Sequence, residues 1–166
     1  MRVKKYKKMI PFIKEYLFNH WTPLNLGEKP KDLLFVKFAD RGIRAPEVGI
    51  ISFLVKKVLP EREEPLMILR FPRYASNLPA NQSLECEYKN LMYIHEKLGS
   101  SCLAFGIPRV CFWQEINSSR VLGISHLPGE SMWQGIAAGD VIKKYLANYV
   151  KAFTWQMGFQ KALGAN

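Results

Sequence analysis

The chain has 166 residues, a formal net charge of +10 and 48% hydrophobic residues. This length suits one ordinary domain, or one small lobe with part of another, and the apolar content excludes wholesale disorder. Five of the positive charges fall within residues 2–8, before the first acidic residue, Glu15. The excess charge favours phosphate-bearing partners, nucleotides included, and leaves the fold open.

Residues 1–20 predict one or two short basic amphipathic helices, which Pro11 should break or restart. The apolar residues at helical spacing are Val3, Tyr6, Ile10, Ile13 and Leu17. Such a segment can contact nucleic acid or an anionic surface, but a solvated helix packed on the following domain is the favoured interpretation. Residues 21–31, with two prolines and a glycine, predict a connector.

Three strands are expected next, at residues 33–39, 49–57 and 66–71. The second strand alternates an apolar face with a face that carries Ser52 and Lys56.

Two connections join these strands. Residues 40–48 contain Gly42 and Pro46 and suit an open hairpin loop. Residues 61–65 are charged except for a final proline and predict a turn.

A helix is expected from the region of Asn81, a candidate N-cap, to Leu98. Leu84 belongs to its apolar stripe, and Glu87 falls on the same side, whereas Glu85 points away. A carboxylate in an apolar stripe is costly unless a cation pairs with it. Glu87 therefore needs a positively charged partner.

Arg70 is the expected partner of Glu87. In the strand at residues 66–71, Ile68 and Arg70 share one face, and the alternating apolar residues take the other. The guanidinium has enough donors to bridge a carboxylate and phosphate oxygens. A purely structural ion pair is the alternative.

Two strands at residues 107–116 and 120–125, joined by a turn at 117–119, follow the helix. A last helix is expected at about residues 140–161. Its expected buried stripe consists of Ile142, Leu146, Tyr149, Phe153 and Met157. The expected fold class is α+β, with an antiparallel sheet of about five strands, one packed helix, an N-terminal helix and a C-terminal helix.

The order of these parts resembles the N-terminal lobe of the aminoglycoside phosphotransferase and choline kinase-like family, which is itself similar to protein kinases. The resemblance covers roughly residues 33–160. It rests on residues 67–72, on Glu87 and the helix after it, on residues 107–110, and on residues 121–130. The ordered set carries the resemblance, because none of the motifs decides it alone.

The resemblance implies three segments. Residues 1–26 would be a basic helical part with a connector, residues 27–130 the lobe, and residues 131–166 a linker and the first helix of a truncated second lobe.

The resemblance also implies a binding site for ATP. Arg70 takes the place of the strand lysine that holds the α- and β-phosphates, and Glu87 takes the place of the helix glutamate that positions it. Ile68 would rest against the adenine ring. Arginine is bulkier than the family's usual lysine, and the two are not interchangeable at a phosphate site.

The same resemblance implies a hinge and a loop around the nucleotide. Backbone groups of Ser125, His126 and Leu127 would meet the adenine edge. Residues 40–49 would cover the phosphates, although Gly42 and Gly49 make a weak glycine-rich loop.

The family's catalytic loop is absent from the sequence. That loop has a histidine, then an aspartate, then an asparagine five residues further, and none of His20, His95 and His126 opens the pattern. The later metal-binding aspartate is missing too, so we find no ligands for the magnesium that whole enzymes of the family use. We therefore expect a truncated phosphotransferase that binds ATP and transfers no phosphate by itself. A small-molecule acceptor would be a partner only with the second lobe.

Two other functions stay open. The basic N-terminus suits a nucleic-acid or anionic-surface binding module, and the lobe suits a regulatory or interaction scaffold. Trp113, Trp133 and Trp155 lie near basic residues, but isolated aromatics are usually core residues, so nucleic acid is not the expected partner. Apolar surface left by a missing lobe would promote association.

The cysteines and the N-terminus bear on the compartment. Cys86, Cys102 and Cys111 are odd in number and form no C-x-x-C pair, so they predict neither a disulfide framework nor a zinc site. A reducing, cytoplasmic setting fits them best. Lys14 and Glu15 interrupt the apolar stretch after the basic run, so we expect neither a cleaved signal nor a transmembrane helix.

Overall fold

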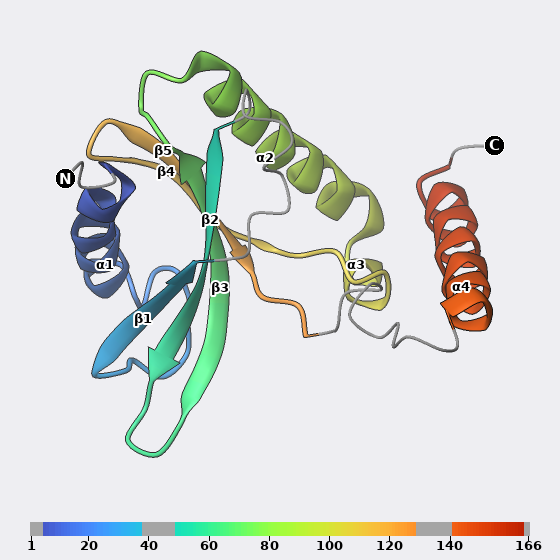
Figure 1. Ribbon diagram of the computed structural model, residues 1–166, viewed down its shortest axis with the longest axis horizontal. Coiled ribbons are helices and arrows are strands. Elements are labelled where there is room, and N and C mark those ends of the chain that lie inside the picture. The colour runs from blue at the N-terminus through green and yellow to red at the C-terminus, as the bar shows by residue number, and fades with distance from the viewer. Residues whose placement is uncertain (1–4, 38–48, 129–140, 165–166) are drawn as a thin grey trace. The chain divides into compact units, whose positions relative to one another are not determined.

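The computed structural model describes residues 5–37, 49–128 and 141–164, and the chain divides into two compact units (Figure 1). The first unit comprises Met1–Met92 and Pro108–His126, and the second comprises Tyr93–Ile107 and Leu127–Asn166. The N-terminal helix therefore belongs to the same unit as the sheet. None of the described helices is both long and apolar enough to cross a membrane.

The first unit contains a five-stranded antiparallel sheet in the order β1-β2-β3-β5-β4. Its strands are β1 (Asp32–Lys37), β2 (Ile50–Val58), β3 (Glu63–Pro72), β4 (Val110–Ile116) and β5 (Ser119–Ser125). The α+β class and the antiparallel sheet expected from the sequence are confirmed. Each strand overlaps a segment that the sequence predicted to be a strand.

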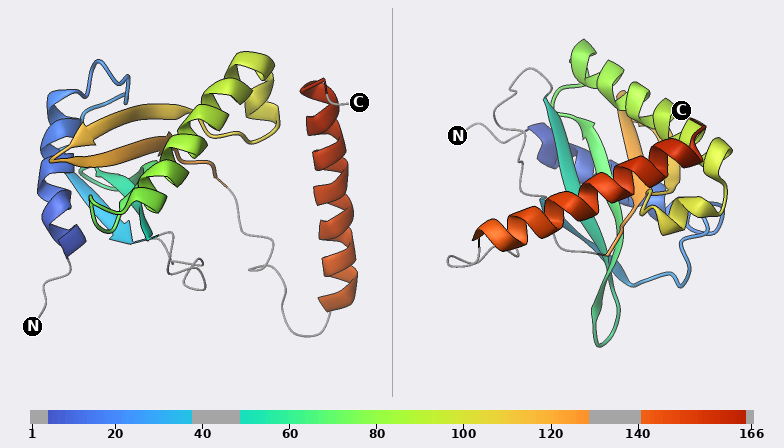
Figure 2. Two further views of the ribbon diagram at one scale, coloured as in Figure 1. Left: turned by 90° about the horizontal axis from the view of Figure 1, so that it is seen from above. Right: turned by 90° about the vertical axis from the view of Figure 1, so that its right-hand side faces the viewer.

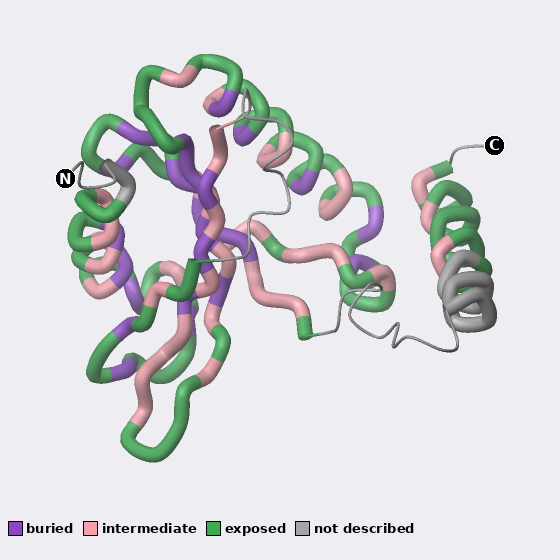
Figure 3. Tube along the Cα trace, viewed as in Figure 1, coloured by how far each residue is buried: buried purple, intermediate pink, exposed green. Residues whose placement is uncertain are grey.

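One face of the sheet forms the hydrophobic core, visible as the buried stretches of the strands in Figure 3. Phe71 of β3 is fully buried, and its ring stacks on that of Phe53 of β2, with centroids 5.8 Å apart. Alternation along β2 and β3 supplies the other central residues of this face, namely Ile51, Val55, Met67 and Leu69.

Helix α1 (Met9–Asn19) covers the core face, and α2 (Leu78–Leu98) begins on the opposite face (Figure 2). Ile13 and Leu17 of α1 are fully buried in the same cluster as the strands. The short 3₁₀ helix η1 (Lys5–Lys8) precedes α1, and Pro11 lies in the first turn of α1, where proline is tolerated. The interpretation of this segment as a helix packed on the domain is confirmed.

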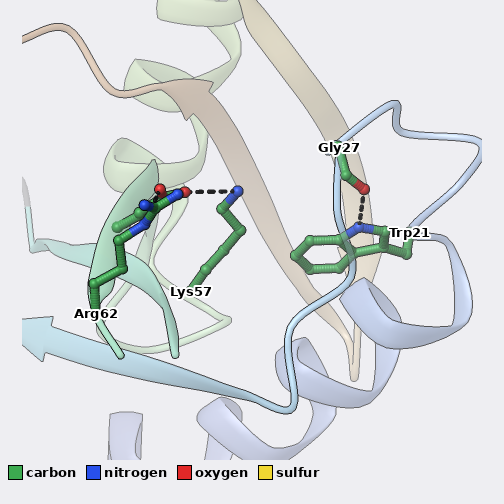
Figure 4. Close-up of polar contacts among 5 residues, drawn as sticks. Trp21, Gly27, Lys57 and Arg62 are labelled. Atoms are coloured by element: carbon green, nitrogen blue, oxygen red, sulfur yellow. Dashed lines mark hydrogen bonds and ion pairs between the residues drawn. The ribbon is translucent and has the colours of Figure 1, made fainter. Parts of the chain in front are cut away.

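The segment between α1 and β1 is part of the core as well as a connector. Trp21 and Leu26 are buried in the same cluster as the sheet. The indole Nε1 of Trp21 donates a hydrogen bond to the carbonyl of Gly27 at 2.8 Å (Figure 4). Gly27 has a φ of 76°, a conformation that favours glycine. The sequence did not predict the burial of Trp21 and Leu26, because the prolines and the glycine of this segment indicated a connector.

The β2–β3 turn is shorter than the sequence predicted. It closes with a hydrogen bond from the Leu59 N–H to the Arg62 carbonyl at 2.9 Å, and β3 already begins at the next residue. Ion pairs link the two strands at this turn: Lys57 and Arg62 (Figure 4) both contact Glu64, at 3.1 and 2.7 Å. Pro65 is accommodated where the register between β2 and β3 shifts.

The β4–β5 hairpin turns through Asn117 and Ser118, which have φ values of 47° and 60°. Two successive left-handed residues are typical of a tight two-residue hairpin turn, so the turn expected here is confirmed. Further along, Gly123 lies opposite Phe112, and a Cβ atom at Gly123 would clash with the Phe112 ring. Glycine is thus required at this position by close approach of an aromatic ring.

Asn77, and not Asn81, caps helix α2. The Asn77 Oδ1 accepts a hydrogen bond from the Ala80 N–H at 3.2 Å, as an N-cap side chain does. Asn81 lies inside the helix, where its Nδ2 donates to the carbonyls of Ala75 and Asn77 at 2.9 and 3.0 Å. The sequence prediction named Asn81 alone, because it assigned the residues before Asn81 to a loop.

The second unit contains α3 (Ser101–Ala104) and α4 (Val141–Ala162). Trp155 of α4 donates from its Nε1 to the carbonyl of Phe105 at 2.9 Å, and its ring stacks on that of Phe159 at 5.0 Å. The aromatic contacts of α4 in this unit therefore come from Trp155 and Phe159.

The buried stripe expected along α4 is wrong for its second half. Phe153 and Met157 are 55% and 53% exposed, because the side of α4 that contacts Phe105 carries Trp155 and Phe159 instead. The other three residues of the expected stripe, at positions 142, 146 and 149, lie outside the part of α4 whose side chains the structure describes.

The three cysteines are free and differ in exposure, which gives a testable order of reactivity. Cys86 is exposed, Cys102 is buried, and burial raises the pKa of the Cys111 thiol. Because the thiolate is the nucleophile, we expect iodoacetamide to modify Cys86 first. Peptide mass spectrometry after limited alkylation of the native chain measures this order, and faster labelling of Cys102 or Cys111 would contradict the packing described here. Alkylation in denaturant should be uniform.

Candidate functional site

An ion pair between β3 and α2 is the most distinctive polar contact of the first unit. Nη1 of Arg70 donates to Oε1 of Glu87. The side chains are 32% and 24% exposed, so the pair is partly withdrawn from water. The pairing expected from the spacing of the two residues is confirmed, whereas its role toward a nucleotide stays a prediction.

Strand alternation explains why Arg70 is available for this contact. Met67, Leu69 and Phe71 enter the core, so Arg70 emerges on the opposite face, where α2 begins. Across the sheet, Arg70 is paired with Ser52 of β2. The position of the cation is therefore fixed by the burial of its neighbours in the same strand.

The guanidinium of Arg70 has donor capacity that Glu87 does not use. Within the described residues, Nε of Arg70 is buried and has no hydrogen-bond partner. An unsatisfied buried donor costs about 1–3 kcal/mol. The buried Nε itself is out of reach of a ligand, so an oxyanion would contact the part of the Arg70 side chain that stays exposed, which is 32%.

A row of apolar side chains crosses the sheet on the same face. Register pairs Val36 of β1 with Leu54 of β2, Leu54 with Ile68 of β3, and Ile68 with Ile124 of β5. Directly paired residues of antiparallel strands project to the same side. Val36 is 39% exposed, and Leu54 and Ile68 are half-buried, so part of this apolar row is open to a ligand.

The sequence reading included only Ile68 of this row. Val36 and Leu54 were missed because the first strand was predicted without assigning its faces, and the outer face of the second strand was described by Ser52 and Lys56 alone. A hairpin alignment of β1 and β2 with Val36 opposite Leu54 would have placed both residues on the same sheet face as Ile68. The length of the loop between β1 and β2 left that alignment undetermined.

The predicted hinge is only partly free to bind. The Ser125 N–H donates to the carbonyl of Arg109 at 2.8 Å, and Oγ of Ser125 accepts from the Arg109 N–H, also at 2.8 Å. The Ser125 N–H and Oγ are therefore engaged by Arg109, whereas a contact of the Ser125 backbone with adenine stays a prediction. His126 is half-buried and follows the end of β5, and Leu127 is the first residue of its segment in the second unit. Their contacts with adenine stay predictions.

Two further expected parts of the site lie mostly outside the described residues. Residues 40–48, expected to cover the phosphates, are among them, as are residues 129 and 130 of the segment 121–130 that carries part of the resemblance. Gly49 is described, and its carbonyl accepts a hydrogen bond from the Arg73 N–H at 2.6 Å. No group of three or more His, Cys, Asp or Glu side chains with the geometry of a metal site lies in the described ranges.

The arrangement combines an apolar strip with a cation held in place by a carboxylate. Such a face can hold a ligand that has a flat apolar part and an anionic part. Comparison of the chain with protein-family models, curated proteins and solved structures found no match. The family resemblance therefore stays a prediction, and the function is argued from the site itself.

Proposed function

We propose that the first unit binds ATP on the sheet face that carries Arg70. The observation that supports this most is the guanidinium of Arg70, which Glu87 anchors and whose side chain is 32% exposed. Arginine with unused donors is well suited to phosphate oxygens.

The apolar row supplies a surface for the base. Ile68 precedes Arg70 by two residues on the same strand face, a separation of about 7 Å along a strand. Adenine would rest on Val36, Leu54 and Ile68, and this separation would leave room for the ribose before the phosphates reach Arg70. Glu87 would keep the guanidinium from folding away when no ligand is bound.

The proposed function is ATP binding without phosphoryl transfer. Phosphoryl transfer needs a carboxylate that orients the nucleophile and further ligands for magnesium. The sequence contains no catalytic loop of the expected pattern. Arg70 would position ATP but supplies neither the carboxylate nor the magnesium ligands. We therefore expect the chain to bind ATP and to transfer no phosphate.

Isothermal titration of the full chain with ATP tests the proposal. We expect saturable binding that Arg70→Ala weakens by at least about tenfold, because charge-assisted hydrogen bonds contribute about 1.5–3 kcal/mol each. Arg120→Ala is the matched control, since Arg120 is a strand arginine paired with Glu115 at 3.6 Å and lies outside the site. That variant should bind as the wild type does.

Two glutamates of the same helix provide a second comparison. Glu87→Gln removes the charge that anchors Arg70, whereas Glu85→Gln removes a charge that pairs with Lys89 on the exposed side of α2. We expect only the first substitution to weaken ATP binding. Equal affinities of the wild type and Arg70→Ala, or no binding by the wild type, would overturn the proposed function.

A further inference from the structure

A pocket of about 400 Å³ lies in the first unit, and its lining includes neither Arg70 nor the residues of the apolar row. Three segments form it: the start of α1, the loop that follows β3, and the β4–β5 turn. Its lining includes Lys8, Met9, Arg73, Tyr74, Asn117 and Ser119. The volume lies in the range of small-molecule sites, which is roughly 300–1,000 Å³.

Hydrogen bonds hold the walls of this pocket in place. The Arg73 N–H is bonded to the carbonyl of Gly49 at 2.6 Å, and the Asn77 N–H to that of Tyr74 at 2.9 Å. The loop after β3 is thus closed at both ends, since Asn77 also caps α2. A wall fixed in this way loses little entropy when a ligand binds.

In the described part of the chain, the charged residues that line the pocket are Lys8 and Arg73. Lys8 and Arg73 are exposed at its rim, and neither forms an ion pair with an acidic side chain of the described residues. Among the residues that the structure describes, no aspartate or glutamate lines the pocket. Two cations that share one concavity favour a ligand with a double negative charge.

The rest of the lining is apolar or carries neutral polar groups. Tyr74, 52% exposed, offers an aromatic face, and Met9 and Pro72 add apolar surface. Ser76 and Asn117 supply hydroxyl and amide groups suited to phosphate oxygens. The chemistry of the lining therefore suits a compact ligand that joins a phosphate to an apolar group.

We propose that this pocket binds a small phosphomonoester whose organic part is aromatic or apolar. The dianionic phosphate lies between Lys8 and Arg73, and the organic part lies against Tyr74. The confined volume favours a small molecule over a polyanion, which would need an extended basic surface. The site shares no residue with the proposed ATP site.

Phenyl phosphate, titrated into the full chain and followed by calorimetry, is the probe. We expect saturable binding, tighter than that of inorganic phosphate because only the ester contacts Tyr74. Arg73→Ala should weaken it about tenfold or more, and Lys8→Ala severalfold. Lys7→Ala, which removes an exposed neighbouring charge outside the lining, should change the affinity less than about twofold.

Other variants make the result decisive. Ser76→Glu places a carboxylate at the pocket on an exposed loop, where folding should be unaffected, and should abolish binding. Arg70→Ala should leave phenyl phosphate binding unchanged, which separates this site from the ATP site. Equal losses of affinity in Lys7→Ala and Lys8→Ala would overturn the proposal. So would heparin that binds more strongly than phenyl phosphate and still binds to the Ser76→Glu variant. Either result would indicate general attraction to a basic surface.

Discussion

Replacing Phe71 by alanine should cost about 3–5 kcal/mol of unfolding free energy, the range for large-to-small changes of buried aromatic residues. Phe71 is fully buried at the centre of the sheet and stacks on Phe53. Alanine would leave a cavity between the strands and α1 that the surrounding side chains fill only in part. Since small domains have about 5–15 kcal/mol of stability in total, the variant should be close to unfolding.

Urea unfolding followed by far-ultraviolet circular dichroism measures this loss. Phe12→Ala is the matched control, because Phe12 lies on α1 and is 45% exposed. It should cost less than about 1 kcal/mol, as surface substitutions usually do. A similar midpoint for the two variants would show that the core does not lie on the Phe71 face. Phe71→Leu should fall between alanine and the wild type, because it keeps more of the buried volume.

Runs of β-forming residues were sufficient to predict the strands, and alternation of apolar residues separated the two faces of the second and third strands. Met67, Leu69 and Phe71 enter the core, and Arg70 leaves it, as a period of two requires. Two features could not be predicted from the pattern of apolar residues. Asn77 rather than Asn81 caps α2, and Trp21 packs into the core from a segment that resembles a connector. The Asn77 cap is a local contact within residues 77–80 that the prediction missed, whereas the packing of Trp21 depends on tertiary contacts that no short window of sequence contains.

The candidate site was predictable in its charged part and not in its apolar part. Glu87 in an apolar stripe requires a cation, and the strand face of Arg70 supplies one. Val36 and Leu54 join the site only through the register of three strands, which the sequence leaves open. The pocket near Lys8 and Arg73 brings together residues far apart in the chain, so no motif could have predicted it.

The Arg70–Glu87 pair should show a coupling energy of about 1–2 kcal/mol in a double-mutant cycle of unfolding. Arg70→Met, Glu87→Met and the double variant keep much of the side-chain volume and remove the charges. Because the pair is partly withdrawn from water, either single change leaves a poorly solvated charge without its partner. The double change removes both charges, so it should cost less than the sum of the single changes.

The Glu85–Lys89 pair of the same helix is the control for this cycle. Its nitrogen and oxygen are 2.7 Å apart, but its side chains are 51% and 68% exposed, so the coupling should stay near 0.3–0.5 kcal/mol, roughly the value of exposed helical pairs.

Addition of ATP to the unfolding experiment connects stability with binding. A ligand at about 100 times its Kd stabilises the native state by about 2.7 kcal/mol, which we expect for the wild type and not for Arg70→Met. If both proteins gained equally, ATP would be bound elsewhere, and the anchored guanidinium would be a structural contact alone.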